Sequence, residues 1–422
     1  MTVTSEAPSA LGPYRVLDLT QGGYCICARL LGDLGADVIK VEPPGGDPTR
    51  NIGPFYKDVP DPEKSLFWFT YNSNKRGVTL DIETPDGQQI LKKLVRKSDF
   101  VIESFDPGYM AGLGLGYDDL SLINPRIIVT SITPFGQTGP KSSYKGSDLT
   151  GWASGGPLYT MGDPDRAPTG LTFPQAMLHT GVEAAAGAMT AHMYREKTGK
   201  GQVVDVSMQD TLIWALQALI EMYDMNRYNY PRAGGQWVTA GGLGRRQTFS
   251  CKGGYVAFTV LGGGLVGAVR STRAMVDWMK EDGMAADWLV KYDWEHQFDV
   301  SVVTQEEVYR VEEEFLKFFK TKTKTDLWQG ARKRGILLAP VVNVKEITED
   351  EHLKARGYWQ QVHHPELNDT LTYCSSFHAL SETPGRIRRR APLIGEHNDE
   401  VYGKELRMPK SHLAVLKQAG VI

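Results

Sequence analysis

The sequence predicts an α/β protein with a large domain around a doubly wound parallel sheet and a second, smaller α/β domain. The first observation is an alternation, over the first third of the chain, of short apolar runs typical of buried strands with segments of helical spacing. Strands separated by helices imply parallel βαβ units. The second observation is a break in this alternation near residue 226, after which a shorter α/β pattern begins. A chain of 422 residues is long enough for two domains.

The predicted strands of the first third are short and apolar, and they cover residues 14–20, 36–42, 77–82, 99–104 and 125–132. Helical patterns separate them at 27–35, 84–97 and 118–124. The helix at 84–97 has the clearest start, with Thr84 as N-cap and Pro85 at the first helical position. Ligands of such sheets bind at the carboxyl ends of the strands. The candidate mouth of the sheet therefore comprises residues 18–23, 42–47, 103–108 and 133–139.

The later segments predict how the chain divides into domains. Residues 182–193 are Ala-rich and apolar, which indicates a buried helix, and the stretch 227–247 has little periodicity and is the candidate linker. A polar tail from residue 388 is expected to return to the first domain. We predict an N-terminal part of the large domain over 1–225, a small domain over 226–335, and a C-terminal part of the large domain over 336–422.

Composition excludes several classes of function. The net charge of -3 gives no reason to expect nucleic acid or an anionic membrane as partner. No apolar run reaches the roughly 18 residues that cross a bilayer, and the first residues lack the pattern of a secretory signal. The cysteines, Cys25, Cys27, Cys251 and Cys374, are sparse and lack the spacing of a zinc site. The sequence therefore predicts a cytoplasmic protein.

Few local motifs carry chemistry on their own. Two glycine-rich stretches, "GGLG" at 241–244 and "LGGGLVG" at 261–267, could approach a ligand closely, but each taken alone is more often a flexible loop. Lys75 and Arg76 could meet phosphates or form a solvated turn. His363, His364 and His397 lack the spacing of a metal site, so we expect no metal. No G-x-S-x-G elbow is present, which argues against a serine hydrolase.

Seven segments nevertheless occur in a characteristic order: "VLDLT", "LGDLGADVIKVEPPGGDPTR", "NSNKRGVTLDIETPDG", "DFVIESFDPG", "GLGYDDLSLINPRIIVTSITPFGQTGP", "YREKTGKGQVVDVSMQD" and "APLIGEHNDEVY". Together they resemble the family III CoA-transferases, the group that includes formyl-CoA transferase and carnitine CoA-transferase. They span almost the whole chain, with the middle domain weakest. The resemblance implies a large Rossmann-like domain built from both chain ends, a smaller domain between them, and a dimer of interlocked chains.

The resemblance also implies a chemistry and a set of site residues. In the family, an Asp carboxylate attacks an acyl-CoA thioester, forms a mixed anhydride and then an aspartyl-CoA thioester, which is covalent catalysis by a carboxylate. CoA thioesters are thus substrates, and no cofactor is permanently bound. A glycine flap limits hydrolysis of the intermediate, and Gly241, Gly242 and Gly244 match it. The positions that match CoA contacts are Lys75, Phe105 and Lys145, and Asp148 lies near the family's active-site acid.

The chain departs from the family where the nucleophile should be. That position falls on Met177, and the neighbouring Ala176 and Leu178 are not acidic either. A basic residue is also replaced around Gly112, and a polar Gln of the first loop around Gly23. The site thus has the frame of an enzyme with a thioether at the nucleophile position.

Several interpretations stay open. Another carboxylate, Glu183 or Asp148, could replace the Asp in a homodimeric CoA-transferase or in a CoA-ester racemase or isomerase. The chain could bind CoA esters without turnover. We favour a non-catalytic subunit of a heteromeric CoA-transferase, in which a homologous partner carries the Asp and Met177 is an adaptable apolar filler. The resemblance to heteromeric members implies succinyl-CoA and the dicarboxylic acid (R)-2-benzylsuccinate, from anaerobic toluene degradation, as substrates.

Overall fold

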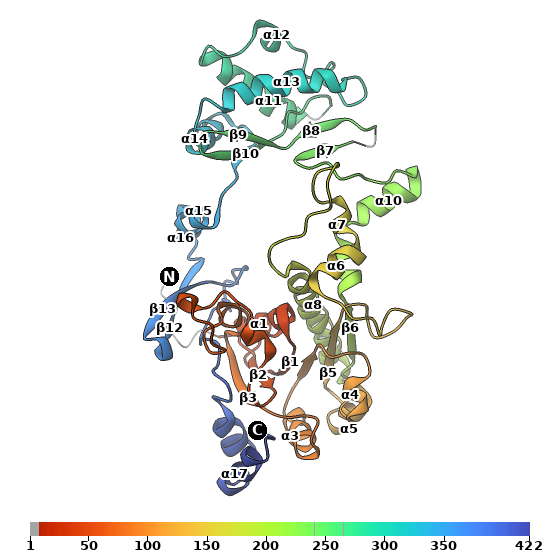
Figure 1. Cartoon of the computed structure of the whole chain (residues 1–422), viewed down its shortest axis with the longest axis vertical. Helices are drawn as coiled ribbons and strands as arrows, with labels where there is room; N and C mark the ends of the chain where they lie inside the picture. Colours follow the sequence, from red (N-terminus) through yellow and green to blue (C-terminus); the bar gives the residue numbers. More distant parts are fainter. Residues whose placement is uncertain (1–7, 240, 265) are drawn as a thin grey trace. The chain divides into compact units, whose positions relative to one another are not determined.

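The computed structural model describes residues 8–239, 241–264 and 266–422, which form two compact units (Figure 1). Unit 1 contains the chain up to Gly156, Leu171–Ala215 and Glu351–Ile422. Unit 2 contains Pro157–Gly170 and Leu216–Asp350. No helix in these described stretches is both long and apolar enough to cross a membrane.

The compact units differ from the predicted domains, whose boundaries fall after residues 225 and 335. Residues 336–350 belong to unit 2, although the sequence places them in the C-terminal part of the large domain, and Pro157–Gly170 belongs to unit 2 as well. The N–H of Gly234 donates to the Gly162 carbonyl at 2.9 Å, and Arg232 Nη1 donates to the Tyr159 carbonyl at 3.2 Å. These bonds join residues that are distant in sequence, so no local pattern could predict them.

A six-stranded parallel sheet forms the centre of unit 1, in the order β3-β2-β1-β4-β5-β6. Its strands are β1 (Arg15–Leu19), β2 (Asp37–Glu42), β3 (Lys75–Thr79), β4 (Phe100–Glu103), β5 (Ile128–Thr133) and β6 (Val203–Ser207). In register, Leu17 of β1 lies opposite Ile39 on one side and Val101 on the other. The strand order reverses between β1 and β4, which is the topological switch point where such sheets bind ligands. The predicted α/β fold with a parallel sheet is confirmed.

The helices of unit 1 connect and cover the strands. They are α1 (Ile26–Asp33), α2 (Leu66–Asn72), α3 (Pro85–Val95), α4 (Tyr109–Gly112), α5 (Tyr117–Ile123), α6 (Asp148–Gly155), α8 (Gln175–Thr198), α9 (Met208–Trp214), α16 (Glu351–Ala355) and α17 (Lys410–Gln418). Short 3-10 or π turns lie at Gly22–Cys25, Pro48–Asn51, Tyr56–Asp58, Pro365–Leu367 and Asp399–Glu405. A hairpin of β12 (Trp359–His364) and β13 (Asp369–Cys374) completes the unit.

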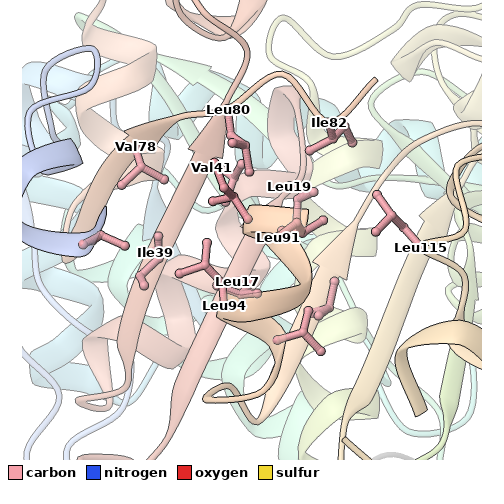
Figure 2. Packing of buried hydrophobic residues seen from close by; sticks show 14 of the residues in the cluster. Leu17, Leu19, Ile39, Val41, Val78, Leu80, Ile82, Leu91, Leu94 and Leu115 are labelled. Atoms are coloured by element: carbon pink, nitrogen blue, oxygen red, sulfur yellow. The ribbon is translucent and has the colours of Figure 1, made fainter. Parts of the chain in front are cut away.

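The two faces of the sheet are covered by different helices because side chains alternate along a strand. On one face, Leu17 and Ile39 pack with Leu91 and Leu94 of α3 (Figure 2). On the other, strand residues such as Val16 pack with the alanines of α1 and α8. Each fully buried aliphatic side chain of this kind contributes about 1.5–3 kcal/mol. The Ala-rich segment that predicts a buried helix is the middle of α8.

Unit 2 has its own core. Its elements are α7 (Pro157–Thr160), α10 (Gln217–Asn226), β7 (Gln236–Val238), β8 (Gly244–Arg246), β9 (Thr248–Cys251), β10 (Gly254–Phe258), α11 (Val266–Glu281), α12 (Asp287–Val290), α13 (Gln305–Phe319), α14 (Lys324–Arg334), β11 (Leu338–Pro340) and α15 (Val344–Glu349). The antiparallel sheet β11-β10-β9 packs through Phe249 and Phe258 against Phe315 and Phe319 of α13. β7 and β8 form a separate hairpin.

The C-terminal segment of the chain packs along β3. The Gly77 N–H donates to His397 Nδ1 at 3.1 Å, the Thr79 N–H to Asn398 Oδ1 at 3.0 Å, and the Tyr402 hydroxyl to the Thr79 carbonyl at 2.9 Å. Unit 1 is therefore built from both ends of the described chain.

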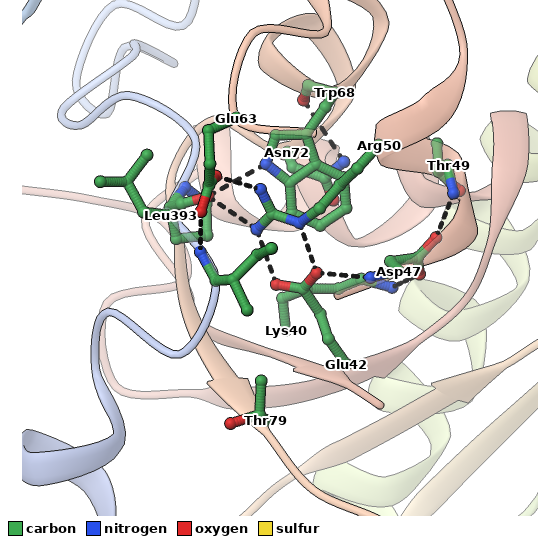
Figure 3. Close-up of polar contacts among 12 residues, drawn as sticks. Lys40, Glu42, Asp47, Thr49, Arg50, Glu63, Trp68, Asn72, Thr79 and Leu393 are labelled. Carbon is green, nitrogen blue, oxygen red and sulfur yellow. Dashed lines mark hydrogen bonds and ion pairs between the residues drawn. The ribbon is translucent and has the colours of Figure 1, made fainter. Parts of the chain in front are cut away.

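Arg50 is the centre of a buried polar network that binds the C-terminal segment to the rest of unit 1 (Figure 3). Its Nε and Nη2 atoms hold the two oxygens of Glu42 at 2.6 and 2.8 Å. Nη1 donates to Glu63 at 2.7 Å, and Nη2 also donates to the Pro392 carbonyl at 2.9 Å. The guanidinium lies 3.8 Å from the ring centroid of Trp68. This buried charge is thus compensated on all its nitrogens, as burial requires.

We predict that Glu42→Gln lowers the free energy of unfolding by about 3 kcal/mol, because it removes the buried bidentate partner of Arg50. The matched control is Glu63→Gln, which affects the same guanidinium through a carboxylate that is 33% exposed. Its loss is expected to stay below about 1 kcal/mol. Urea-induced unfolding measures both. Equal losses for the two variants would contradict the assignment of the bidentate pair as the main anchor.

Candidate functional site

The loop that follows β1 at the switch point is held in place by buried charges from three strands. Asp18 accepts hydrogen bonds from the N–H and hydroxyl of Thr20 at 3.0 and 2.6 Å. Lys75 Nζ on β3 donates to Asp18 Oδ2 at 2.7 Å, and Lys40 on β2 donates to the Thr20 carbonyl. Burial by itself raises the pKa of Asp18, but Lys75 and Lys40 outweigh it, and the pKa lies below its usual value. The loop is thus preorganised around an ionised Asp18.

Lys75, which the resemblance places among the CoA contacts, is completely buried. Besides Asp18, it donates to the Cys25 carbonyl at 2.8 Å and to Asn72 Oδ1 at 2.9 Å. An ammonium group has three N–H donors, and all three are engaged. A contact with CoA would require one of these bonds to be exchanged. The CoA role of Lys75 stays a prediction, and the structure adds a role in fixing the β1 loop.

Met177 lies in the first turn of α8, directly against the β1 loop. A Cβ atom on Gly22 would come within 2.5 Å of Met177 Cε, and one on Gly23 within 2.8 Å of Met177 Cβ. Glycine at both positions therefore permits this close packing, and Gly22 also has a φ of +59°. The position that the resemblance assigns to the nucleophile is thus at the mouth of the sheet, filled by a half-buried thioether.

Asp148 is the carboxylate that the structure places beside Met177. It is the first residue of α6, and its Oδ1 accepts the N–H of Met177 at 2.9 Å. The start of a helix has unpaired N–H groups and favours an anion. Burial raises the pKa of Asp148, and the N–H groups of Met177 and Ala176 oppose this rise. Glu183 is exposed and lies about 1.7 turns farther along α8, on a different side of the helix.

A cavity of about 470 Å³ lies at the carboxyl ends of β1 to β4. Its lining includes Gln21, Pro43, Glu83 and Phe105, so three of the four stretches of the predicted mouth come together there. The Phe105 ring stacks on Tyr109 with centroids 4.7 Å apart. Residues 133–139 are not part of this lining, and the Gln137 N–H there is bonded to Asp205 at 3.0 Å.

Lys145 reaches the same end of the sheet, because it forms an ion pair with Asp106 in the loop after β4. Both side chains are mainly exposed, so this pair adds little stability. Lys145 is thus available at the surface, although its charge is matched by a carboxylate.

The predicted flap glycines lie in the β7–β8 hairpin of unit 2. Gly241 and Gly242 are in its turn, where Gly242 has a φ of +83° and donates its N–H to the Thr239 carbonyl at 2.9 Å. Gly244 is the first residue of β8, and its N–H donates to Gln305 Oε1 at 2.7 Å. The flap role of these glycines stays a prediction, and Gly244 is bonded to the first residue of α13. In the second glycine stretch, Gly262 and Gly263 are buried whereas Gly264 and Gly267 are exposed, and Leu265 lies outside the described residues.

The predicted histidines have structural partners. His364 bonds to Glu366 at 2.7 Å and to the Tyr373 hydroxyl at 2.9 Å, and His397 accepts the Gly77 N–H. Within the described part of the chain, no group of three or more His, Cys, Asp or Glu side chains could hold a metal ion.

Glu103 begins the predicted mouth stretch 103–108, but sequence reasoning gave it no role of its own. It ends β4 at the switch point, is 5% exposed, and accepts the Phe105 N–H at 2.7 Å. Burial raises its pKa to about 7, with Asp205 adding to the rise and the Ser131 hydroxyl and the Phe105 N–H opposing it. Its place as the last residue of a strand beside the switch point is the signal that could have identified it.

The model of the family "CoA-transferase family III" matches residues 11–398 of the chain. The chain therefore belongs to that family, whose chemistry implies CoA thioesters as substrates. The succinyl-CoA:(R)-benzylsuccinate CoA-transferase subunit BbsE of Thauera aromatica is 32% identical over 400 residues, 92% of each chain. The succinyl-CoA–L-malate CoA-transferase beta subunit of Chloroflexus aurantiacus is 31% identical over 94% of each chain. A crystal structure of a CAIB/BAIF family protein from Brucella suis has a TM-score of 0.76 at 27% identity, covering 94% of this chain and 99% of that one.

We predict that Glu103 makes stability fall as pH rises from about 4.5 to about 7. Over this range the folded protein keeps the Glu103 proton, while a glutamate in the unfolded chain, with its ordinary pKa of 4.5, has lost it. The folded state then binds more protons, so the free energy of unfolding decreases with pH. Relative to Glu103→Gln, the wild type should lose about 3 kcal/mol across this window. Chemical denaturation at several pH values measures it. The exposed Glu382→Gln is the control, and parallel curves for all three proteins would refute the shift.

Proposed function

We propose that this chain is the non-catalytic subunit of a heteromeric CoA-transferase, and that a homologous subunit with an Asp at the position of Met177 performs the chemistry. The observation that carries the proposal is Met177 itself, packed on Gly22 and Gly23 where the family's nucleophile is expected. A thioether cannot form the acyl anhydride through which a carboxylate transfers CoA. Two relatives named as subunits of CoA-transferases support a partner chain.

The surrounding frame supports a scaffold role for this chain. The β1 loop, the buried pair of Lys75 and Asp18, and the first turn of α8 are all ordered without a nucleophile. We propose that this frame serves the interface with the catalytic subunit, in an interlocked assembly located in the cytoplasm. CoA contacts through Phe105 and Lys145 are part of the same proposal.

We propose succinyl-CoA and (R)-2-benzylsuccinate as the substrate pair of the assembly. The relative from Thauera aromatica, named for these two substrates, supports this pair. The second relative, named for succinyl-CoA and L-malate, has the same CoA donor and also a dicarboxylate acceptor. A dicarboxylic acid as acceptor is therefore the broader form of the proposal.

A second candidate function is a self-sufficient CoA-transferase in which Asp148 replaces the missing Asp. The observation that favours it is the position of the Asp148 carboxylate, 2.9 Å from the Met177 nitrogen, with a pKa raised by burial. In that case, hydroxylamine trapping during turnover would label Asp148 in the isolated chain.

We predict that the isolated chain does not transfer CoA from succinyl-CoA to (R)-2-benzylsuccinate, and that co-expression with its Asp-containing homologue gives activity. Replacing that Asp by Ala in the homologue should abolish transfer. Met177→Leu in this chain keeps the side-chain volume and should change the activity of the pair by less than about twofold.

Activity of the isolated chain would contradict the proposal. If Asp148→Asn then removed that activity, the second candidate function would replace it. A discontinuous chromatographic assay of both CoA esters distinguishes transfer from simple hydrolysis.

A further inference from the structure

Arg245 of β8 is a buried arginine whose hydrogen-bonding groups are not satisfied. Its side chain is among the largest fully buried ones, with the residue 2% exposed. The Nε and Nη2 atoms have no hydrogen-bond partner among the described residues. A buried polar group normally has a partner, and each exception calls for an explanation, such as a ligand that the ligand-free protein does not contain.

The unpartnered atoms are the ones that this chain uses elsewhere to hold carboxylates. The Nε and Nη2 atoms of Arg50 bind both oxygens of Glu42, at 2.6 and 2.8 Å. The same edge of Arg76 binds both oxygens of Asp37, at 2.9 and 2.7 Å. Such a planar fork matches a carboxylate with two parallel hydrogen bonds. In Arg245, the same edge has no carboxylate among the described residues.

The two acidic side chains that attract the charge of Arg245 are already engaged. Asp299 accepts the N–H of Ser301 at 2.9 Å and also its hydroxyl, and Glu312 accepts the N–H of Arg246 at 2.7 Å. Burial lowers the pKa of Arg245, and the attraction of these two carboxylates opposes the decrease. The two carboxylates thus stabilise the charged guanidinium without forming hydrogen bonds to its Nε and Nη2 atoms. The guanidinium thus retains both its charge and its free fork.

The guanidinium of Arg245 lies 5.3 Å from the ring centroid of Phe298, and glycines precede Arg245 in the sequence. Arg245 follows Gly244, and the β7–β8 turn with Gly241 and Gly242 is close along the same hairpin. A Cβ on Gly242 would meet no atom within 4 Å, so the turn has open space around it. A glycine turn can change conformation at low steric cost. A ligand could reach the buried fork only if the hairpin moves, and its glycine turn permits such a movement.

We infer that the Nε and Nη2 edge of Arg245 binds one carboxylate of a small dicarboxylic acid. The class of ligand rests on the proposed function, in which such acids exchange CoA. A dicarboxylic acid has one carboxylate that reacts and a second one that does not. A buried arginine with two parallel N–H donors can bind the second carboxylate and so recognise the acid. The small unit of this chain would then contribute to the choice of acid, even though the chain carries no nucleophile.

The test uses the full chain and succinate as the probe, without any CoA compound. Thermal unfolding and isothermal titration calorimetry are expected to show succinate binding to the wild type. Arg245→Met removes the fork and is expected to abolish binding. It should also raise the unfolding midpoint without succinate, because replacing an unsatisfied buried charge by an apolar side chain is neutral or stabilising. Arg245→Lys keeps the charge without the fork and should weaken binding at least about tenfold.

The matched control is Arg246→Met, on the adjacent residue, which forms ion pairs with Glu312 and Glu313. It should keep succinate binding and lower the unfolding midpoint. The inference is overturned if the wild type does not bind succinate, if Arg245→Met binds as well as the wild type, or if Arg245→Met lowers the midpoint as Arg246→Met does. Because no CoA transfer is measured, these outcomes are independent of whether the chain is catalytic.

Discussion

The buried ion pair of Lys75 and Asp18 is the interaction on which the site depends. It joins β3 to β1 beneath the switch point, and the other bonds of Lys75 and Asp18 determine the path of the β1 loop. The loop in turn brings Gly22 and Gly23 against the first turn of α8. A buried pair gains little net stability because desolvation costs nearly as much as the attraction. Its effect here is to specify one conformation of the loop.

The chain belongs to CoA-transferase family III, and Met177 occupies the position at which the resemblance predicts the nucleophile. The interactions that hold the β1 loop and the start of α8 at the mouth of the sheet do not involve a reacting carboxylate. The apolar and adaptable side chain of Met177 therefore leaves these elements intact. Asp148 accepts the N–H of Met177, one of the unpaired N–H groups in the first turn of α8. Arg50 has its nitrogens engaged within the protein, which is a structural use of a buried arginine. The Nε and Nη2 atoms of Arg245 have no partner among the described residues, as the proposed binding of a ligand requires.

Much of unit 1 could be predicted, because its information is local. The apolar runs at β1, β2, β4 and β5 and the capped start of α3 each follow from neighbouring residues. The mouth of the sheet followed from the general rule for parallel sheets. The assignment of Pro157–Gly170 to unit 2 and the raised pKa of Glu103 could not be predicted. Both depend on groups that are distant in sequence, a hydrogen bond to Gly162 in one case and burial beside Asp205 in the other.

The family, the parallel α/β architecture and the lack of an acidic residue at position 177 could all be read from the chain before it folds, because they follow from residue types, their order and their periodicity. Only the folded protein determines which charged side chains have hydrogen-bonding atoms that are not already engaged. Lys75, a candidate CoA contact by sequence, has all its donors engaged in the core, whereas Arg245, unremarked in the sequence, has two nitrogens without partners among the described residues. The physical reason is that the availability of a charged group depends on burial and on partners from other elements, and tertiary packing alone brings these together.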